Sequence, residues 1–123
     1  MNGVILYQSK YGATRKYAQW LFAATNFDLL EMKQAKGTDL SRYEVIVFGG
    51  GIYASGIAGL NALKKQLAHL SPQKVVIFCV GASPYDEQAL AAIKEHNMDG
   101  PLKDLPLFYC RGGLPAFRRY SDP

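Results

Sequence analysis

The chain has few of the groups that mark a hydrolytic or metal-dependent enzyme. Its 123 residues include two cysteines, Cys79 and Cys110, and two histidines, His69 and His96. No Cys/His spacing predicts a zinc or iron–sulfur site, and no Ser/His/Asp group is recognisable. We therefore expect no metal site and no catalytic side chain. Both cysteines lie inside apolar runs, which predicts reduced, buried thiols in a cytoplasmic protein rather than a disulfide framework.

Long hydrophobic segments are also missing. No apolar run approaches the roughly 20 residues that span a bilayer, and the N-terminus does not have the pattern of a signal peptide. We expect a cytoplasmic protein without stable membrane insertion. The length fits a single domain over residues 1–123.

The chain has fewer acidic than basic residues, 10 against 14, and its net charge is +4. The clustered basic residues are Lys10, Arg15 and Lys16 near the start, and Arg111, Arg118 and Arg119 near the end. They form neither a long stripe nor a recognition helix, so nucleic acid is not an expected partner. Anion binding near the first cluster, or contact with an acidic partner or a membrane surface, fits better.

The start of the chain predicts a phosphate cradle. An apolar strand over residues 2–8 leads into a short loop with Ser9 and Gly12, and a helix over residues 14–25 follows. A helix N-terminus offers free N–H groups and partial positive charge, and glycine lets an anion approach the backbone. An ordinary strand–loop–helix unit with Thr14 as N-cap is the alternative. Neither the nucleoside-triphosphate P-loop motif nor the Gly-x-Gly-x-x-Gly dinucleotide fingerprint is present.

Apolar strands and amphipathic helices alternate along the rest of the chain. The expected strands are 2–8, 27–33, 44–49, 74–80 and 105–110, and the expected helices are 14–25, 57–70 and 85–97, with a helical turn at 39–43. This alternation predicts an α/β fold with a five-stranded parallel sheet covered on both faces. After the fifth strand the chain is too short and too proline-rich for the helix that such a sheet normally places last.

Ligands of open parallel sheets bind beyond the carboxyl ends of the strands. Three loops should converge there: residues 9–14, 49–59 and 81–86. The second loop carries five glycines around Tyr53, which can stack on a flat ligand or pack on the protein in a flexible turn. In the third loop, Tyr85 is a candidate second wall, and a surface position or a helix entry fits it equally.

Three segments carry a family resemblance: residues 6–16 (LYQSKYGATRK), 43–53 (YEVIVFGGGIY) and 107–114 (LFYCRGGL). With them the chain resembles the flavodoxin superfamily, in particular the short flavodoxin-domain branch that includes menaquinone-dependent protoporphyrinogen dehydrogenase. The resemblance extends to about residue 114. It implies a doubly wound flavodoxin-like sheet in the order 2-1-3-4-5.

The resemblance implies FMN as the cofactor. On this interpretation the phosphate is held by Ser9, Lys10, Tyr11, Gly12, Ala13 and Thr14. The isoalloxazine ring is lined by Ile52, Tyr53, Ala54, Ser55 and Gly56, and along its other edge by Gly81, Ala82 and Ser83. The flavin carries the redox chemistry, and the protein tunes it by stacking, charge and backbone contacts.

The implied function is an FMN-binding electron carrier or a simple flavin oxidoreductase, with redox proteins or a quinone as partners. A quinone-linked protoporphyrinogen dehydrogenase-like enzyme and a flavin-free interaction module are the alternatives, so whether the protein is an enzyme stays open. Typical flavodoxins are acidic around the flavin, whereas this chain is basic, so its partners are expected to differ in charge. Without a last helix, strand five is expected at the sheet edge, with a homodimer covering the exposed face through Phe117.

Overall fold

The structure is a computed structural model that describes residues 2–9, 12–54, 56–70, 74–84, 86–111 and, for the backbone, 117–119. The strands are β1 Gly3–Gln8, β2 Asp28–Glu31, β3 Val45–Tyr53, β4 Gly56–Ile57, β5 Lys74–Gly81, β6 Leu107–Arg111 and β7 Phe117–Arg119. The helices are α1 Ala13–Thr25, α2 Met32–Ala35, α3 Leu60–Leu67 and α4 Glu87–Asn97, with short 3-10 helices η1 Leu40–Arg42 and η2 Gly100–Leu102.

The strand order confirms the predicted parallel sheet. Strands β2, β1, β3, β5 and β6 lie side by side in that order and pair in parallel. They correspond to the five strands predicted from the sequence, in the predicted order 2-1-3-4-5. The apolar runs in β1, β3 and β5 are buried because helices lie on both sides of a parallel sheet.

The end of the sheet differs from the prediction. Strand β6 was expected at the edge, but β7 pairs with it antiparallel, with Phe108 opposite Arg119 and Cys110 opposite Phe117. The chain reverses direction after β6 instead of crossing over, so a short hairpin extends the sheet. Among the described residues no helix follows β6. The side chain of Phe117 lies outside the described residues.

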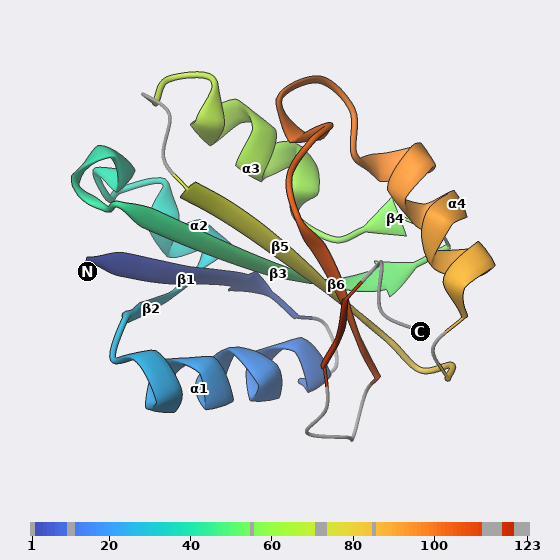
Figure 1. Cartoon of the computed structure of the whole chain (residues 1–123). Coiled ribbons are helices and arrows are strands. Elements are labelled where there is room, and N and C mark those ends of the chain that lie inside the picture. The colour runs from blue at the N-terminus through green and yellow to red at the C-terminus, as the bar shows by residue number, and fades with distance from the viewer. Residues whose placement is uncertain are drawn as a thin grey trace.

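The helices form two unequal layers (Figure 1). Helix α1 lies on one side of the sheet, and α2, α3 and α4 lie on the other. The larger core, with Phe48, Leu63 and Leu90, fills the side of the three helices. The smaller core, with Tyr17 and Phe78, lies on the α1 side.

The second long helix is shorter than the sequence predicts. Apolar spacing predicted a helix over residues 57–70, but α3 begins at Leu60, after Gly59 in a left-handed conformation with φ 82°. Ile57 belongs to β4, where it pairs with Ile52. Its side chain is buried in the same core as Leu60, so burial against one core produced the helix-like spacing across two elements.

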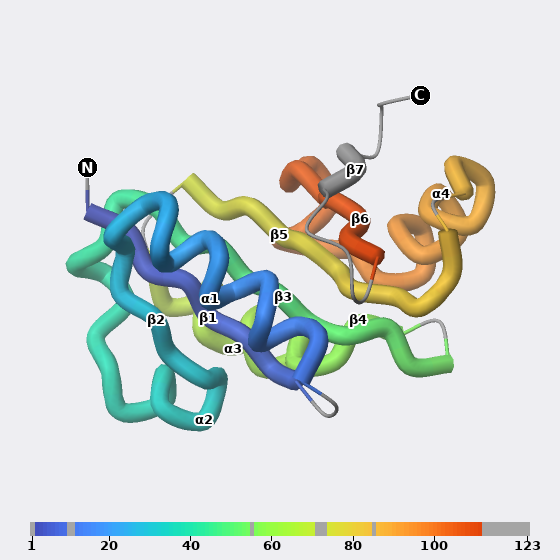
Figure 2. Tube along the Cα trace, turned by 90° about the horizontal axis from the view of Figure 1, so that it is seen from below, coloured from blue at the N-terminus to red at the C-terminus, as the bar shows by residue number. Residues whose placement is uncertain are grey.

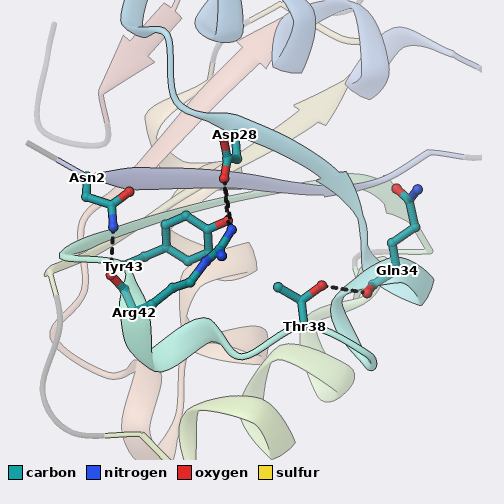
Figure 3. A network of polar contacts seen from close by, with 6 residues as sticks. All are labelled: Asn2, Asp28, Gln34, Thr38, Arg42 and Tyr43. Carbon is teal, nitrogen blue, oxygen red and sulfur yellow. Dashed lines mark hydrogen bonds and ion pairs between the residues drawn. The ribbon is translucent and has the colours of Figure 1, made fainter.

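A polar network fixes the amino-terminal edge of the sheet (Figure 3). The Tyr43 hydroxyl donates to Asp28 Oδ2 at 2.5 Å, and Arg42 Nη2 lies 3.3 Å from the same oxygen. Asn2 Nδ2 donates to the Arg42 carbonyl oxygen at 2.7 Å. The network connects β2, the turn η1 and the residue before β1. It lies at the opposite end of the strands from the loops in which the ligand site is expected.

The two cysteines lie on adjacent strands but on opposite faces of the sheet. Cys79 is in register with Tyr109, and Cys110 is in register with Val80. Neighbouring residues of a strand point to opposite faces, and accordingly Cys79 belongs to the larger core and Cys110 to the smaller one. Both thiols are free. We predict that thiol titration of the denatured protein without reductant finds two free cysteines; finding none would contradict this arrangement.

Candidate functional site

A hydrogen bond to the Ser9 hydroxyl closes the turn between β1 and α1. Ser9 Oγ accepts a hydrogen bond from the Gly12 N–H at 2.9 Å. Gly12 has φ 92° and precedes the 13-residue helix α1, whose first hydrogen bond runs from the Lys16 N–H to the Gly12 carbonyl oxygen at 3.1 Å. The remaining candidates of this loop, Lys10 and Tyr11, lie outside the described residues. The described part is a preformed turn at a helix N-terminus.

Thr14 does not cap this helix. The N-cap position is Gly12, and α1 begins at Ala13. Thr14 is only 2 % exposed and lies within the first turn of α1. The alternative that assigned Thr14 a capping role is therefore wrong, because left-handed Gly12 starts the helix earlier than the sequence pattern indicates.

The glycine-rich segment 49–59 was predicted as a loop, and this is also wrong for most of its length. Strand β3 continues through the three glycines to Tyr53. A Cβ atom at Gly49 would lie 1.9 Å from the Phe78 ring, and one at Gly50 would lie 2.2 Å from the Ala58 carbonyl oxygen. The glycines thus make room for a core aromatic and for the returning chain.

The end of β3 folds back as a tight hairpin. Ala54 has φ 50°, and Tyr53 pairs with Gly56 on β4. The Tyr53 side chain is half-buried and lies over Gly51, where a Cβ atom would come within 2.8 Å of the tyrosine hydroxyl. Ser55 lies outside the described residues. The alternative that Tyr53 packs against its own protein is therefore correct for part of its ring.

Tyr53 also lies beside the first turn. Together with Ser9, Gln8 and Ala58 it lines a hollow of about 340 Å³. Two of the three segments singled out from the sequence therefore meet at the carboxyl ends of β1 and β3.

The third segment meets β3 on its other side. Ile52, Gly81, Ala82 and Ser83 line a larger cavity of about 750 Å³. The cavity is also lined by residues from the segment just before α4, from α4 itself and from β6: Pro84, Asp86, Ala89, Leu90, Ile93 and Tyr109. Tyr85 lies outside the described residues. The end of β3 thus separates two hollows, with Tyr53 at one and Ile52 at the other.

Tyr109 is a site residue that the sequence analysis missed. Its hydroxyl donates a hydrogen bond to the Ser83 carbonyl oxygen, and a Cβ atom at Gly81 would lie 2.8 Å from that hydroxyl. Burial, together with the nearby Cys79, raises the pKa of Tyr109, while Arg111 opposes the shift. Alternation along β6 indicates which face Tyr109 occupies, but not that it reaches a loop 26 residues earlier.

The carboxylate of Asp86, at the larger cavity, already accepts hydrogen bonds from the backbone. Asp86 Oδ1 accepts hydrogen bonds from the Gln88 and Ala89 N–H groups, at 2.9 and 3.3 Å, and so caps α4.

The two histidines, His69 and His96, are exposed. Within the described ranges, no three His, Cys, Asp or Glu side chains form a group that could hold a metal ion. Each helix in those ranges is too short or too polar to cross a bilayer.

Comparison with known proteins places this chain in a family. The family model of the flavodoxin domain matches residues 4–121, and the chain belongs to this family. No curated protein matches the chain significantly in sequence.

Solved structures share the fold at low sequence identity. A flavodoxin from the domain Archaea is 17% identical, with a TM-score of 0.61 over 90% of this chain and 83% of that one. Oxidised Flavodoxin 2 from Bacillus cereus is 16% identical, with a TM-score of 0.59 over 91% and 85%. A flavoprotein from Lactobacillus acidophilus NCFM, in complex with FMN, is 17% identical, with a TM-score of 0.61 over 89% and 91%. These likenesses establish the fold.

Proposed function

We propose that the protein binds FMN at the carboxyl edge of its sheet and acts as an electron carrier or a simple flavin oxidoreductase in the cytoplasm. The observation that carries the proposal is the meeting of three separate segments at this edge, around the two hollows that contain Ser9 and Ile52. Membership of the flavodoxin domain family supports it. When bound, FMN supplies the electron-transfer chemistry.

The described residues fit such a group. The turn before α1 offers backbone N–H groups at a helix N-terminus, where phosphate binds favourably. Apart from Gly12 itself, its chain neighbours and the backbone of α1, no described atom lies within 4 Å of the Cβ position of Gly12, so an anion can approach that backbone. Ile52, Ile93 and Tyr109 give the larger cavity apolar walls for a flat ring. The phosphate would rest on the turn, and the ring would lie against the end of β3 and the loop after β5.

Reconstitution tests this proposal. The purified protein is denatured to identify any released chromophore, refolded, and incubated with excess FMN. Retention of one FMN per chain is the expected result, and a folded protein that retains none would instead be a flavin-free interaction module. Oxidation of protoporphyrinogen driven by a quinone would separate the dehydrogenase-like alternative from a carrier.

Replacing Thr14 with alanine is expected to weaken FMN binding by about one to two orders of magnitude. A hydrogen bond to a charged group contributes roughly 1.5–3 kcal/mol, and Thr14 lies in the first turn of α1. Thr25→Ala, at the other end of that helix, is the matched control and should bind FMN normally. Equal affinity of both variants, measured by flavin fluorescence quenching, would remove Thr14 from the site.

Gly12→Val should weaken binding further. Valine at φ 92° is strained, so the turn must change shape. Gly100→Val is the control, because Gly100 also has a positive φ with open space around its Cβ position, but it lies in η2. The control should lose stability without losing FMN affinity. Normal FMN binding by Gly12→Val would exclude this turn as the phosphate site.

Tyr53→Ala is expected to weaken FMN binding about three- to tenfold, since an aromatic stacking contact contributes roughly 0.5–1.5 kcal/mol. It should also shift the redox potential of the flavin, because the ring loses a neighbour. Tyr53→Phe retains the aromatic face and should remain close to the unmodified protein in both respects. Potentiometric titration of the three proteins measures the shift. An unchanged potential in Tyr53→Ala would show that Tyr53 does not contact the flavin ring.

A further inference from the structure

An apolar recess opens on the α1 side of the sheet. It has a volume of about 240 Å³ and is lined by Leu21, Val47, Val76, Phe78 and Phe108. Every one of these side chains is hydrocarbon. Leu21 forms a wall on α1, and the others come from β3, β5 and β6. Val47, Val76 and Phe108 are only half-buried, although they sit on a parallel sheet, whose faces are normally covered.

The recess exists because α1 covers only part of its side of the sheet. Figure 2 looks from this side and shows α1 along β1 and β3, with β5 and β6 beside it. At the carboxyl end of β6, the Tyr17 hydroxyl donates to the Arg111 carbonyl oxygen at 2.5 Å and connects α1 to that strand. Away from this contact, among the described residues, no second helix lies over β5 and β6 on the α1 side of the sheet.

The elements that line the recess carry charge of one sign. Helix α1 and strands β3, β5 and β6 contain no Asp or Glu. On this side of the sheet their basic residues are Arg15 and Lys16 of α1 and Lys74, which alternation places on the same face of β5 as Val76. Of these, Lys16 lies over the Trp20 ring at 5.7 Å from its centroid, on the same helix as Leu21. All ten acidic residues of the chain lie on other segments.

We propose that the apolar recess docks an amphipathic helix of a partner protein, with acidic residues on both sides of its apolar stripe. An apolar groove between a helix and a sheet takes a helix with anchors at i, i+3, i+4 and i+7. Opposite charges at the rim speed association and select the partner. A second copy of this chain is the rival occupant, but two copies would bring identical basic rims together, which is unfavourable.

This surface is separate from the proposed FMN site. The recess lies on the α1 side of the sheet, whereas the larger ligand cavity contains Leu90 and Ile93 of α4 on the other side. The docking test therefore needs no flavin, and its outcome is independent of the proposed function.

The probe is a designed, fluorescently labelled peptide of about 18 residues, which is roughly 27 Å long as a helix. It carries leucines at i, i+3, i+4 and i+7 and glutamates on either side of them. A second peptide has lysine at every glutamate position, and a third has the first composition in scrambled order. We expect the Glu peptide to bind at least tenfold more tightly than the other two, by fluorescence anisotropy, and to weaken as salt is added.

Two variants and a control locate the binding. Leu21→Glu should weaken the Glu peptide at least tenfold, because it places a carboxylate in the recess wall. Lys74→Glu should reduce the difference between the Glu and Lys peptides, because Lys74 is exposed and lies on the same face of β5 as Val76. Lys65→Glu makes the same charge change on α3, across the sheet, and should leave binding unchanged.

Other outcomes would overturn the proposal. Equal binding of the three peptides, or none at millimolar concentration, would exclude an acidic helix as the occupant. A concentration-dependent dimer, by sedimentation, that Leu21→Glu dissociates would make a second copy the occupant. Binding to vesicles with phosphatidylserine, without binding to the Glu peptide, would assign the recess to an anionic bilayer instead.

Discussion

Replacing Gly50 with alanine is expected to lower the free energy of unfolding by about 3 kcal/mol or more. The new Cβ atom would lie 2.2 Å from the Ala58 carbonyl oxygen and 2.9 Å from the Ile57 side chain. The first of these atoms is backbone in the returning segment, whose Ala58 N–H donates to the Gly51 carbonyl oxygen at 2.8 Å. The whole hairpin would have to move to relieve the overlap. Urea unfolding followed by circular dichroism measures the loss.

Gly37→Ala is the control for this variant. The closest atom to its Cβ position is 4.0 Å away, so alanine fits and should change stability by less than about 1 kcal/mol. If Gly50→Ala were as stable as this control, β3 and the segment after β4 could not pack as described.

The energetic coupling between Gly49 and Phe78 gives a related test. Its Cβ atom would overlap the Phe78 ring, a side chain rather than backbone. Removing the ring should therefore relieve the clash, and Gly49→Ala should cost less stability in a Phe78→Leu background than in the unmodified protein. A double-mutant cycle measures this coupling.

Alkaline pH is expected to destabilise the protein strongly through its buried thiols. Burial raises the pKa of Cys79 from its ordinary value of 9.0 to about 12, and burial also raises the pKa of Cys110, with a further contribution from Cys79. In the unfolded chain these thiols ionise near pH 9, whereas the folded state holds them neutral. Their contribution is complete below pH 9 and is lost as the pH rises toward 12, by up to about 4 kcal/mol for Cys79.

The measurement is urea unfolding at pH 8 and at pH 11, with two variants for comparison. Cys79→Ala should lose less stability between these values, because one ionising thiol is gone. Val80→Ala, the next residue on the same strand, should be less stable at both values but keep the original pH dependence. A pH dependence identical in Cys79→Ala and the unmodified protein would assign the alkaline loss to other groups.

The strands and their parallel sheet followed from the sequence because each core strand is a continuous apolar run separated from the next by helical spacing. Residues 74–80, for example, were predicted as a strand and form most of β5. The three segments that carry the family resemblance, residues 6–16, 43–53 and 107–114, together added the family and hence the order of the strands. These are local signals, and neighbouring residues supply all the information they need.

The errors arose where packing between distant segments decides the outcome. Glycine is typical of loops, so the strand was predicted to end at Gly49, but β3 continues through Gly50 and Gly51 to Tyr53. Glycine is needed at position 50 because the Ala58 carbonyl oxygen occupies the space beside it. Distant contacts also give Tyr109 its role, through a carbonyl on another loop. Such contacts leave no trace in the composition or spacing of the segment itself.

The placement of the two cysteines on opposite faces of the sheet has a consequence for following motions of the molecule. Cys110 is enclosed in the layer that contains α1, and Cys79 in the layer that contains α3 and α4. A thiol reagent can reach either group only when its own layer opens. The reaction rates of the two thiols, resolved by mass spectrometry, therefore record the opening of each layer separately, and the chain carries its own pair of reporters.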